Sequence, residues 1–426
     1  MHVCRRWRSI VFKSPRHLGL ELVGTARTPA RKMLDVWPAL PLIVSCDDSS
    51  TGRADNIIAL LERSDRVCRA SLKKVRSSKL ETFLAIMQQP FPELKHLSLY
   101  SNDRPRPLVP DSFLAGSAPR MESLLLHGLR YPGLPKLLLS ATHLNSLLLI
   151  IPHTGYISPD AMGTALSASI SLESFLLEFQ SSKSRPDQES RRPPPSTRSL
   201  LPVLKDFEFK GVSEYLDDFV AHIDAPQLNR LDVTFFKNTV YNAPQLIQFI
   251  SRSPISSVLI ADIRLRDTTA RLNFSSHSSG QRKRKNLNLM IPCGRATDQL
   301  TSFLEQIFSS CLPPLSMLED LHISVFLDSQ PNPTENNRLF LEMLRPFTSV
   351  KNLYLPFELS PRVSFALQDL VEEGRTTEVL PALRTIFLEG FDSKSSGRVQ
   401  GKIEQFVAAR QVAGHTIAIS DLFINR

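Results

Sequence analysis

Apolar residues recur along the chain in short groups that share one spacing. In the first clear group, Leu94, Leu97 and Leu99 are separated by polar residues. Apolar residues two positions apart are typical of a strand with one buried face, so Leu97 and Leu99 are expected to point into a core. The same spacing returns at 121–126, 144–149, 172–177, 204–209, 228–233, 318–323, 350–355 and 383–388. The pattern predicts a long series of short strands.

Segments between these groups carry apolar residues at helical spacing. Leu80, Phe83, Leu84 and Met87 form a stripe at i, i+3, i+4 and i+7. Elsewhere Ser158 followed by a proline is typical of a helix start. Units of one strand and one helix, repeated at roughly 23–32 residues, indicate a leucine-rich-repeat solenoid. The predicted fold class is α/β, a horseshoe with a parallel concave sheet and helices outside.

Some stretches interrupt this pattern. Residues 181–199 contain Arg, Ser and Pro with almost no apolar side chain, and residues 275–285 are similarly polar, so both are predicted to be flexible loops. Between 255 and 291, apolar groups follow one another without a helix, which predicts a plain hairpin. The repeat asparagine occurs at Asn102, whereas Gly128-Leu129 and Ile151-Pro152 stand there in later units, which indicates looser turns. Residues 18–426 are otherwise predicted to form one solenoid.

Composition narrows the range of partners. The formal net charge of +9 is compatible with nucleic acid, but much of the excess lies in 185–198 and 282–285, among the Ser, Pro and Gly typical of solvated loops. A nucleic-acid partner is therefore not favoured. No apolar run is long enough for a bilayer, and the first residues lack the apolar region of a secretory signal. Five widely spaced cysteines favour a reducing compartment, so we expect the cytoplasm or nucleus.

Catalytic motifs are not found in the sequence. It has no phosphate-binding glycine loop, no nucleophile elbow and no zinc-protease motif. Asp47-Asp48 and Asp217-Asp218 are adjacent acids that should point apart, so we interpret them as solvated surface pairs. The histidines lack metal-ligand spacing. We therefore expect no enzyme, no cofactor and no metal.

The outward positions of the strands suggest a recognition surface. Leucine occupies the middle outward position in three successive units, and neighbouring strands lie about 4.8 Å apart, so these leucines should form an apolar stripe. Acidic residues continue the stripe. The predicted substrate-binding surface consists of Leu125, Leu148, Ile150, Leu176, Glu178, Asp206, Glu208 and Asp232. This pattern predicts a protein target with an apolar anchor and a basic flank; alternatively, a loop such as 181–199 covers the leucines.

The N-terminal segment has a pattern of its own. The string Val3-Cys4-Arg5-Arg6-Trp7, followed by an apolar pair and Ser-Pro, resembles the second half of an F-box. This resemblance implies docking on the Skp-type adaptor of a cullin-RING ubiquitin ligase through Val3, Cys4, Trp7 and Ile10. The first half of the motif is absent because Met1 falls inside the pattern. Residues 1–17 are therefore either a partial F-box or a helix that caps the solenoid.

The chain as a whole resembles fungal F-box-like proteins with irregular leucine-rich repeats. The resemblance is carried by residues 133–144, 210–216, 346–355 and 376–381. It implies a substrate-recognition subunit of a Skp-cullin-F-box ubiquitin ligase that binds a protein target on the concave surface. The alternative is a stand-alone interaction scaffold with no link to a ligase.

Overall fold

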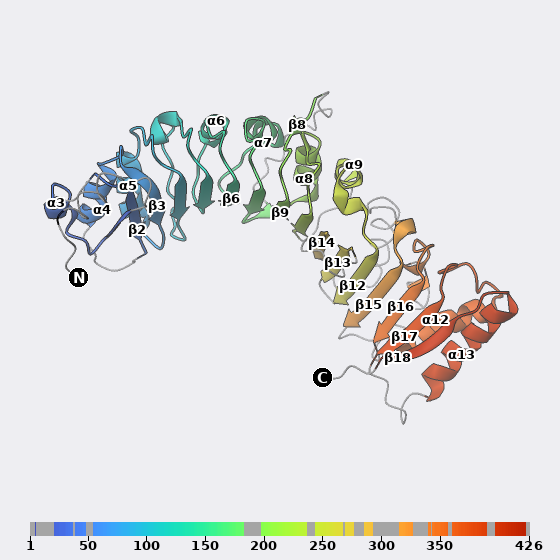
Figure 1. The fold of residues 1–426 in the computed structure, drawn as a ribbon. Coiled ribbons are helices and arrows are strands. Elements are labelled where there is room, and N and C mark those ends of the chain that lie inside the picture. The colour runs from blue at the N-terminus through green and yellow to red at the C-terminus, as the bar shows by residue number, and fades with distance from the viewer. Residues whose placement is uncertain are drawn as a thin grey trace. The chain divides into compact units, whose positions relative to one another are not determined.

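The computed structural model shows an α/β chain with a large, mostly parallel sheet and flanking helices (Figure 1). It describes residues 5, 21–36, 39–47, 54–182, 197–236, 243–266, 269–276, 285–292, 315–326, 340–341, 343–356, 360–389 and 397–422. The chain divides into two compact units. The first comprises Met1–Glu208 with His222–Pro226, and the second comprises Phe209–Ala221 with Gln227–Arg426.

Strands of the first unit follow one another in the sheet in sequence order. They are β1 (Leu22–Thr25), β2 (Leu42–Cys46), β3 (Val67–Leu72), β4 (His96–Tyr100), β5 (Ser123–His127), β6 (Ser146–Ile151) and β7 (Ser174–Phe179). Each pair among them is parallel, and Leu99, Leu126, Leu149 and Leu177 stand opposite one another. The predicted alignment of the repeated leucines in one sheet is therefore confirmed.

The ends of residues 181–199 are ordered. Strand β8 (Ser199–Leu200) pairs in parallel with β10 (Ile223–Asp224) in a separate two-stranded sheet. The Ser199 hydroxyl donates to the backbone oxygen of Gly163 at 3.2 Å. The predicted loop thus stops short of Ser199, while residues 183–196 lie outside the described part of the chain.

Helices of the first unit occupy the connections between the strands (Figure 1). They are α3 (Ala30–Met33), α4 (Ala54–Leu61), α5 (Ser77–Ile86), α6 (Leu134–Ser140) and α7 (Pro159–Leu166), with a 3-10 turn at Phe113–Gly116. The predicted stripe of α5 is buried at Leu80, Phe83 and Leu84. The predicted start of α7 is also confirmed, because the Ser158 hydroxyl accepts from the backbone N–H of Ala161 at 3.2 Å.

Strands of the second unit include one that runs against its neighbours. Strand β9 (Asp206–Gly211) is divided between the units: its residues up to Glu208 belong to the first unit, and those from Phe209 on belong to the second. The order of the other strands is β11 (Arg230–Phe235), β14 (Asn286–Pro292), β13 (Thr269–Ser275), β12 (Ile260–Arg266), β15 (Asp320–Phe326), β16 (Asn352–Pro356), β17 (Thr385–Glu389) and β18 (Ala418–Leu422). β13 is antiparallel to β12 and β14. Antiparallel strands need no helical crossover, and the hairpin predicted between 255 and 291 is confirmed by the pairing of β12, β13 and β14.

The predicted loop 275–285 is shorter than its limits suggested. Ser275 is the last residue of β13, and the backbone N–H of Ser276 donates to the oxygen of Lys285 at 3.3 Å. Both ends of the stretch therefore belong to the base of the hairpin. Residues 277–284 between them are outside the described ranges.

Helices of the second unit are α8 (Ser213–Val220), α9 (Pro244–Arg252), α12 (Ser360–Glu372) and α13 (Gly397–Val412), with 3-10 turns at Pro254–Ser256 and Leu315–Met317. Helix α13 packs against α12. It also carries a completely buried Arg410, whose guanidinium donates to the backbone oxygens of Thr376 at 3.1 Å, Leu380 at 2.9 Å and Pro381 at 3.2 Å. One side chain thus holds the segment between α12 and β17 in place.

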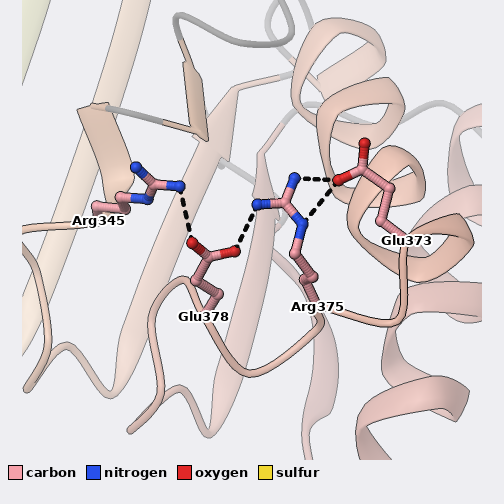
Figure 2. A network of polar contacts seen from close by, with 4 residues as sticks. All are labelled: Arg345, Glu373, Arg375 and Glu378. Atoms are coloured by element: carbon pink, nitrogen blue, oxygen red, sulfur yellow. Dashed lines mark hydrogen bonds and ion pairs between the residues drawn. The ribbon is translucent and has the colours of Figure 1, made fainter.

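The outer side of the same segment carries a chain of ion pairs (Figure 2). Glu378 accepts from Arg345 and from Arg375, each at 2.7 Å, and Arg375 also pairs with Glu373. All four side chains are exposed to solvent. Exposed pairs of this kind contribute little to stability, so the buried arginine is the stronger restraint on the segment.

One interpretation of the sequence is wrong. Asp217 does not belong to a solvated pair: it is only 3% exposed, and its Oδ1 accepts from the backbone N–H groups of Gln245 at 2.7 Å and Leu246 at 3.0 Å. Helix α9 begins after Ala243, which has no side chain able to cap it. Asp217 on α8 therefore supplies the acceptor that the start of α9 lacks.

Candidate functional site

Three leucines line up across the face of the first unit's sheet. Leu125, Leu148 and Leu176 stand opposite one another on β5, β6 and β7, and we call them the leucine row. The residues flanking each of them along its strand are buried, whereas the row itself is half-buried. Alternate residues of a strand point to opposite faces, so the row lies on the face turned away from the core. The predicted alignment is observed; the predicted role of these side chains in binding stays a prediction.

A second row runs parallel to the first, one outward position nearer the carboxyl ends of the strands. It consists of Tyr100, His127, Ile150 and Glu178, which stand opposite one another on β4 to β7. The rings of Tyr100 and His127 stack, with centroids 4.0 Å apart and planes 19° from parallel. Ile150 continues this surface beside Leu148. The two rows together make an apolar and aromatic surface across neighbouring strands.

The opposite flank of the leucine row carries small side chains. Ser123, Ser146 and Ser174 stand opposite one another there, each two residues before a leucine of the row. Serine side chains are short, so they leave the leucines accessible from this side. The leucine row is therefore flanked by short serine side chains on one side and by the larger side chains of the second row on the other.

Burial disfavours the charged form of the histidines His96 and His127 on this face. Burial lowers the pKa of His127 below its usual value, and the nearby charge of Arg106 lowers it further. Burial likewise lowers the pKa of His96, with a smaller effect of the same sign from Arg69. Burial therefore favours the uncharged ring at both positions, where the imidazoles add aromatic surface to the site.

The acidic residues predicted for the surface lie on β7, β9 and β11. Glu178 is half-buried at the end of the second row, and Asp206 and Glu208 are exposed on β9, the neighbour of β7 in the sheet. Asp232 belongs to the second unit, where its carboxylate accepts from Arg230 Nε at 2.6 Å. Its negative charge is thus offset locally. The structure brings together Leu125, Leu148, Ile150, Leu176 and Glu178 on β5 to β7.

The residues predicted to contact an adaptor cannot be placed on this surface. Val3, Cys4, Trp7 and Ile10 lie outside the described residues. Their role stays a prediction carried by the sequence resemblance.

A cavity opens at the carboxyl ends of β5 and β6, directly beside Ile150. Its volume is about 240 Å³. The strands contribute Leu126, Leu149, Ile150 and Ile151, helix α6 contributes Leu134, and the loops contribute Leu108, Leu129, Arg130, Tyr131, Pro132, Thr154, Gly155, Tyr156 and Ile157. These loops lie at the positions where other residues replace the asparagine expected from the repeat. The looser turns predicted there are the feature of the sequence that pointed to this cavity. Asn102 itself is exposed and donates to the Tyr100 hydroxyl at 2.7 Å.

Two half-buried arginines adjoin the cavity. Arg106 donates to the backbone oxygen of Ser101 at 2.7 Å and to Oε1 of Gln180 at 3.3 Å, and Arg130 donates to the backbone oxygen of Arg106 at 3.4 Å. The Nε atoms of both are buried and have no partner. Within the described residues, neither guanidinium forms an ion pair. This edge of the sheet therefore carries two guanidiniums that have no ion-pair partner among the residues that the structure describes.

No family model and no curated protein matches this chain. The geometry of the chain's own residues is therefore what indicates function. Within the described ranges, no group of three or more His, Cys, Asp or Glu side chains is placed to hold a metal ion. Nor is any described helix both long and apolar enough to cross a lipid bilayer. The site can bury apolar groups on the leucine row and in the cavity, and it can bind carboxylates at the arginines.

Proposed function

We propose that this chain is a leucine-rich-repeat solenoid of the F-box type that recognises a protein target and recruits it to a Skp-cullin-F-box ubiquitin ligase. The observation that carries the proposal is the register of Leu125, Leu148 and Leu176 on adjacent parallel strands. Aligned apolar side chains on an outward face are typical of protein interaction sites. Aromatic and aliphatic neighbours at His127 and Ile150 extend the area available to a target.

The solenoid proposal is supported by the way the units recur. In the first unit, parallel strands follow one another in sequence order, and a helix or turn lies in each connection between β1 and β7. A unit of this kind buries its apolar faces only when its neighbours stack on it. The exposed faces of stacked strands then form one extended binding surface. In this proposal the chain binds its target and leaves catalysis to the ligase.

The leucine row is tested by making it polar. We expect the double variant Leu148→Asp with Leu176→Asp to lose the targets that wild-type protein captures by proximity labelling in cells, because aspartate cannot replace a buried apolar contact. A matched control carries Leu139→Asp with Ile170→Asp, at positions that are 45% and 60% exposed outside the row. An unchanged set of targets in the row variant would remove this surface from the proposal.

The ligase link is tested separately with purified Skp-type adaptor. We expect the full chain to bind the adaptor and the variant Trp7→Ala to bind it less well, because the resemblance places Trp7 among the docking residues. The row variant keeps adaptor binding if the two surfaces act independently. Absence of adaptor binding by the wild-type chain, with target capture intact, would leave a stand-alone interaction scaffold.

A further inference from the structure

The cavity beside Ile150 has the size of one large side chain. Drug-sized ligands occupy pockets of roughly 300–1,000 Å³, and a water molecule takes roughly 30 Å³. A cavity of about 240 Å³ lies below the first range and well above the second. Its strand-derived walls are aliphatic, at Leu126, Leu149 and Ile151. The group that fits best is therefore a single large aliphatic or aromatic side chain.

The cavity is continuous with the proposed recognition surface. Ile150 lines the cavity and also stands in the second row beside Leu148. Leu108, which is 51% exposed, lies at the rim. A polypeptide that lies across the leucine row can therefore place a side chain in the cavity without leaving the sheet.

The positively charged arginines at the cavity favour an anionic ligand. Arg130 lines the cavity, and Arg106 lies next to it with no carboxylate in ion-pair distance of either guanidinium within the described residues. Half-buried charges without a counter-charge are costly, and a guanidinium pairs with a carboxylate through two parallel hydrogen bonds. A carboxylate from a ligand would offset the charge that the chain leaves uncompensated.

Another buried polar group in the lining also lacks a partner. Tyr131 is 7% exposed, and its ring packs edge-on against Phe113 with centroids 5.8 Å apart. Its hydroxyl is buried without a hydrogen-bond partner among the described residues. Burial raises the pKa of Tyr131 above its usual range, so the hydroxyl stays protonated. The lining thus offers a neutral hydroxyl in addition to the guanidinium.

We propose that the cavity receives one large apolar side chain of the target polypeptide, and that Arg130 pairs with a carboxylate next to that side chain. The inference rests on the proposed target recognition and specifies its chemistry. It replaces the basic flank expected from the sequence by an acidic one at this end of the surface. The carboxylate comes from a neighbouring Asp or Glu or from the end of the target chain.

The proposal is tested with a random-peptide display selection on the full chain, followed by fluorescence anisotropy with the enriched peptides. We expect enrichment of Phe, Leu, Ile or Met beside an acidic residue or beside a free C-terminus. Synthetic versions of the peptides separate the two sources of charge: C-terminal amidation weakens binding in one case, and Glu→Gln weakens it in the other. Either loss is expected to be tenfold or more.

Variants of the protein identify the site. Arg130→Gln removes the charge and is expected to weaken the acidic peptide about tenfold while leaving its amidated or Gln version unchanged. Thr154→Trp adds bulk at an exposed position of the lining and should weaken both versions. Arg104→Gln removes an exposed arginine outside the lining and is the matched control. Circular dichroism confirms that each variant is folded.

Several outcomes would overturn the proposal. The proposal is rejected if the selection yields no peptide whose binding depends on Arg130 and Thr154. It is also rejected if Arg130→Gln and Arg104→Gln weaken peptide binding equally. Binding of a free acid such as 3-phenylpropionate as tightly as the peptides would assign the cavity to a small molecule. If Leu148→Asp with Leu176→Asp abolishes peptide binding while Thr154→Trp does not, the row is retained and the cavity is rejected. Peptide binding unaffected by the row variant counts against the proposed function itself.

Discussion

The buried Arg410 provides the sharpest test of how the second unit is held together. Its side chain is 0% exposed and reaches from α13 to three backbone oxygens between Thr376 and Pro381. Replacing it with methionine keeps most of the aliphatic volume and removes every donor. The variant Arg410→Met should therefore release the segment without opening a large cavity.

The expected magnitude follows from the hydrogen bonds that are lost. A buried acceptor left without its donor costs about 1–3 kcal/mol. The oxygen of Thr376 belongs to a buried residue and loses its donor, the oxygen of Leu380 keeps the backbone N–H of Leu383 as a donor at 3.0 Å, and Pro381 is half-buried and reaches water more easily. Burial of the guanidinium, which lowers the pKa of Arg410, is itself unfavourable and offsets part of the loss. We expect a net loss of about 1–3 kcal/mol, which lowers the Tm of the unit by about 2–12 °C.

Hydrogen exchange is the most direct assay, because it reports on each segment separately. In Arg410→Met, amides of residues 376–383 should lose protection together with those of α13, and the unfolding midpoint in urea should fall. The control is Arg384→Met, which removes an exposed arginine at the start of β17 and should change stability by no more than about 0.5 kcal/mol. Equal behaviour of the two variants would refute the reasoning about the buried guanidinium.

Other predictions follow from the same structure. Asp217→Ala should cost about 2–4 kcal/mol and expose the first amides of α9 to exchange, whereas Gln245→Ala keeps the backbone donor and should be neutral; equal protection in both would contradict the cap. Arg375→Ala should leave the urea midpoint unchanged at physiological salt, because its ion pairs are exposed, and a clear decrease would contradict this. Burial lowers the pKa of His127, so the folded state binds a proton less readily than the unfolded state, and stability falls as pH drops below the usual 6.5. The unfolding midpoint of His127→Gln should therefore differ less between pH 7.5 and 5.5 than that of the wild-type chain. An unchanged difference would argue against the burial effect.

The candidate site contains one feature that the sequence predicted and one that it did not. The spacing of Leu125, Leu148 and Leu176 predicted their alignment, because a repeated unit with a fixed strand position forces equivalent residues into register. The cavity could not be predicted in the same way. Arg106 and Arg130 lie on separate loops, and only the packing of those loops brings the Arg130 guanidinium to the backbone oxygen of Arg106. Charge in the sequence favoured a basic ligand, whereas the structure places uncompensated positive charge beside the row.

The sequence by itself determined the strands, their alternation of buried and outward positions, the start of α7 and the hairpin that interrupts the repeats. Each of these depends on residues close together in the chain, which is why periodicity and turn chemistry reveal them. The tertiary structure decided what Asp217 and Arg410 do. Their partners lie 28–29 and 29–34 positions away, and no local pattern specifies which backbone groups a buried charge will meet. The packing of segments far apart in the chain fixes these contacts, because most buried donors and acceptors are paired in a folded protein.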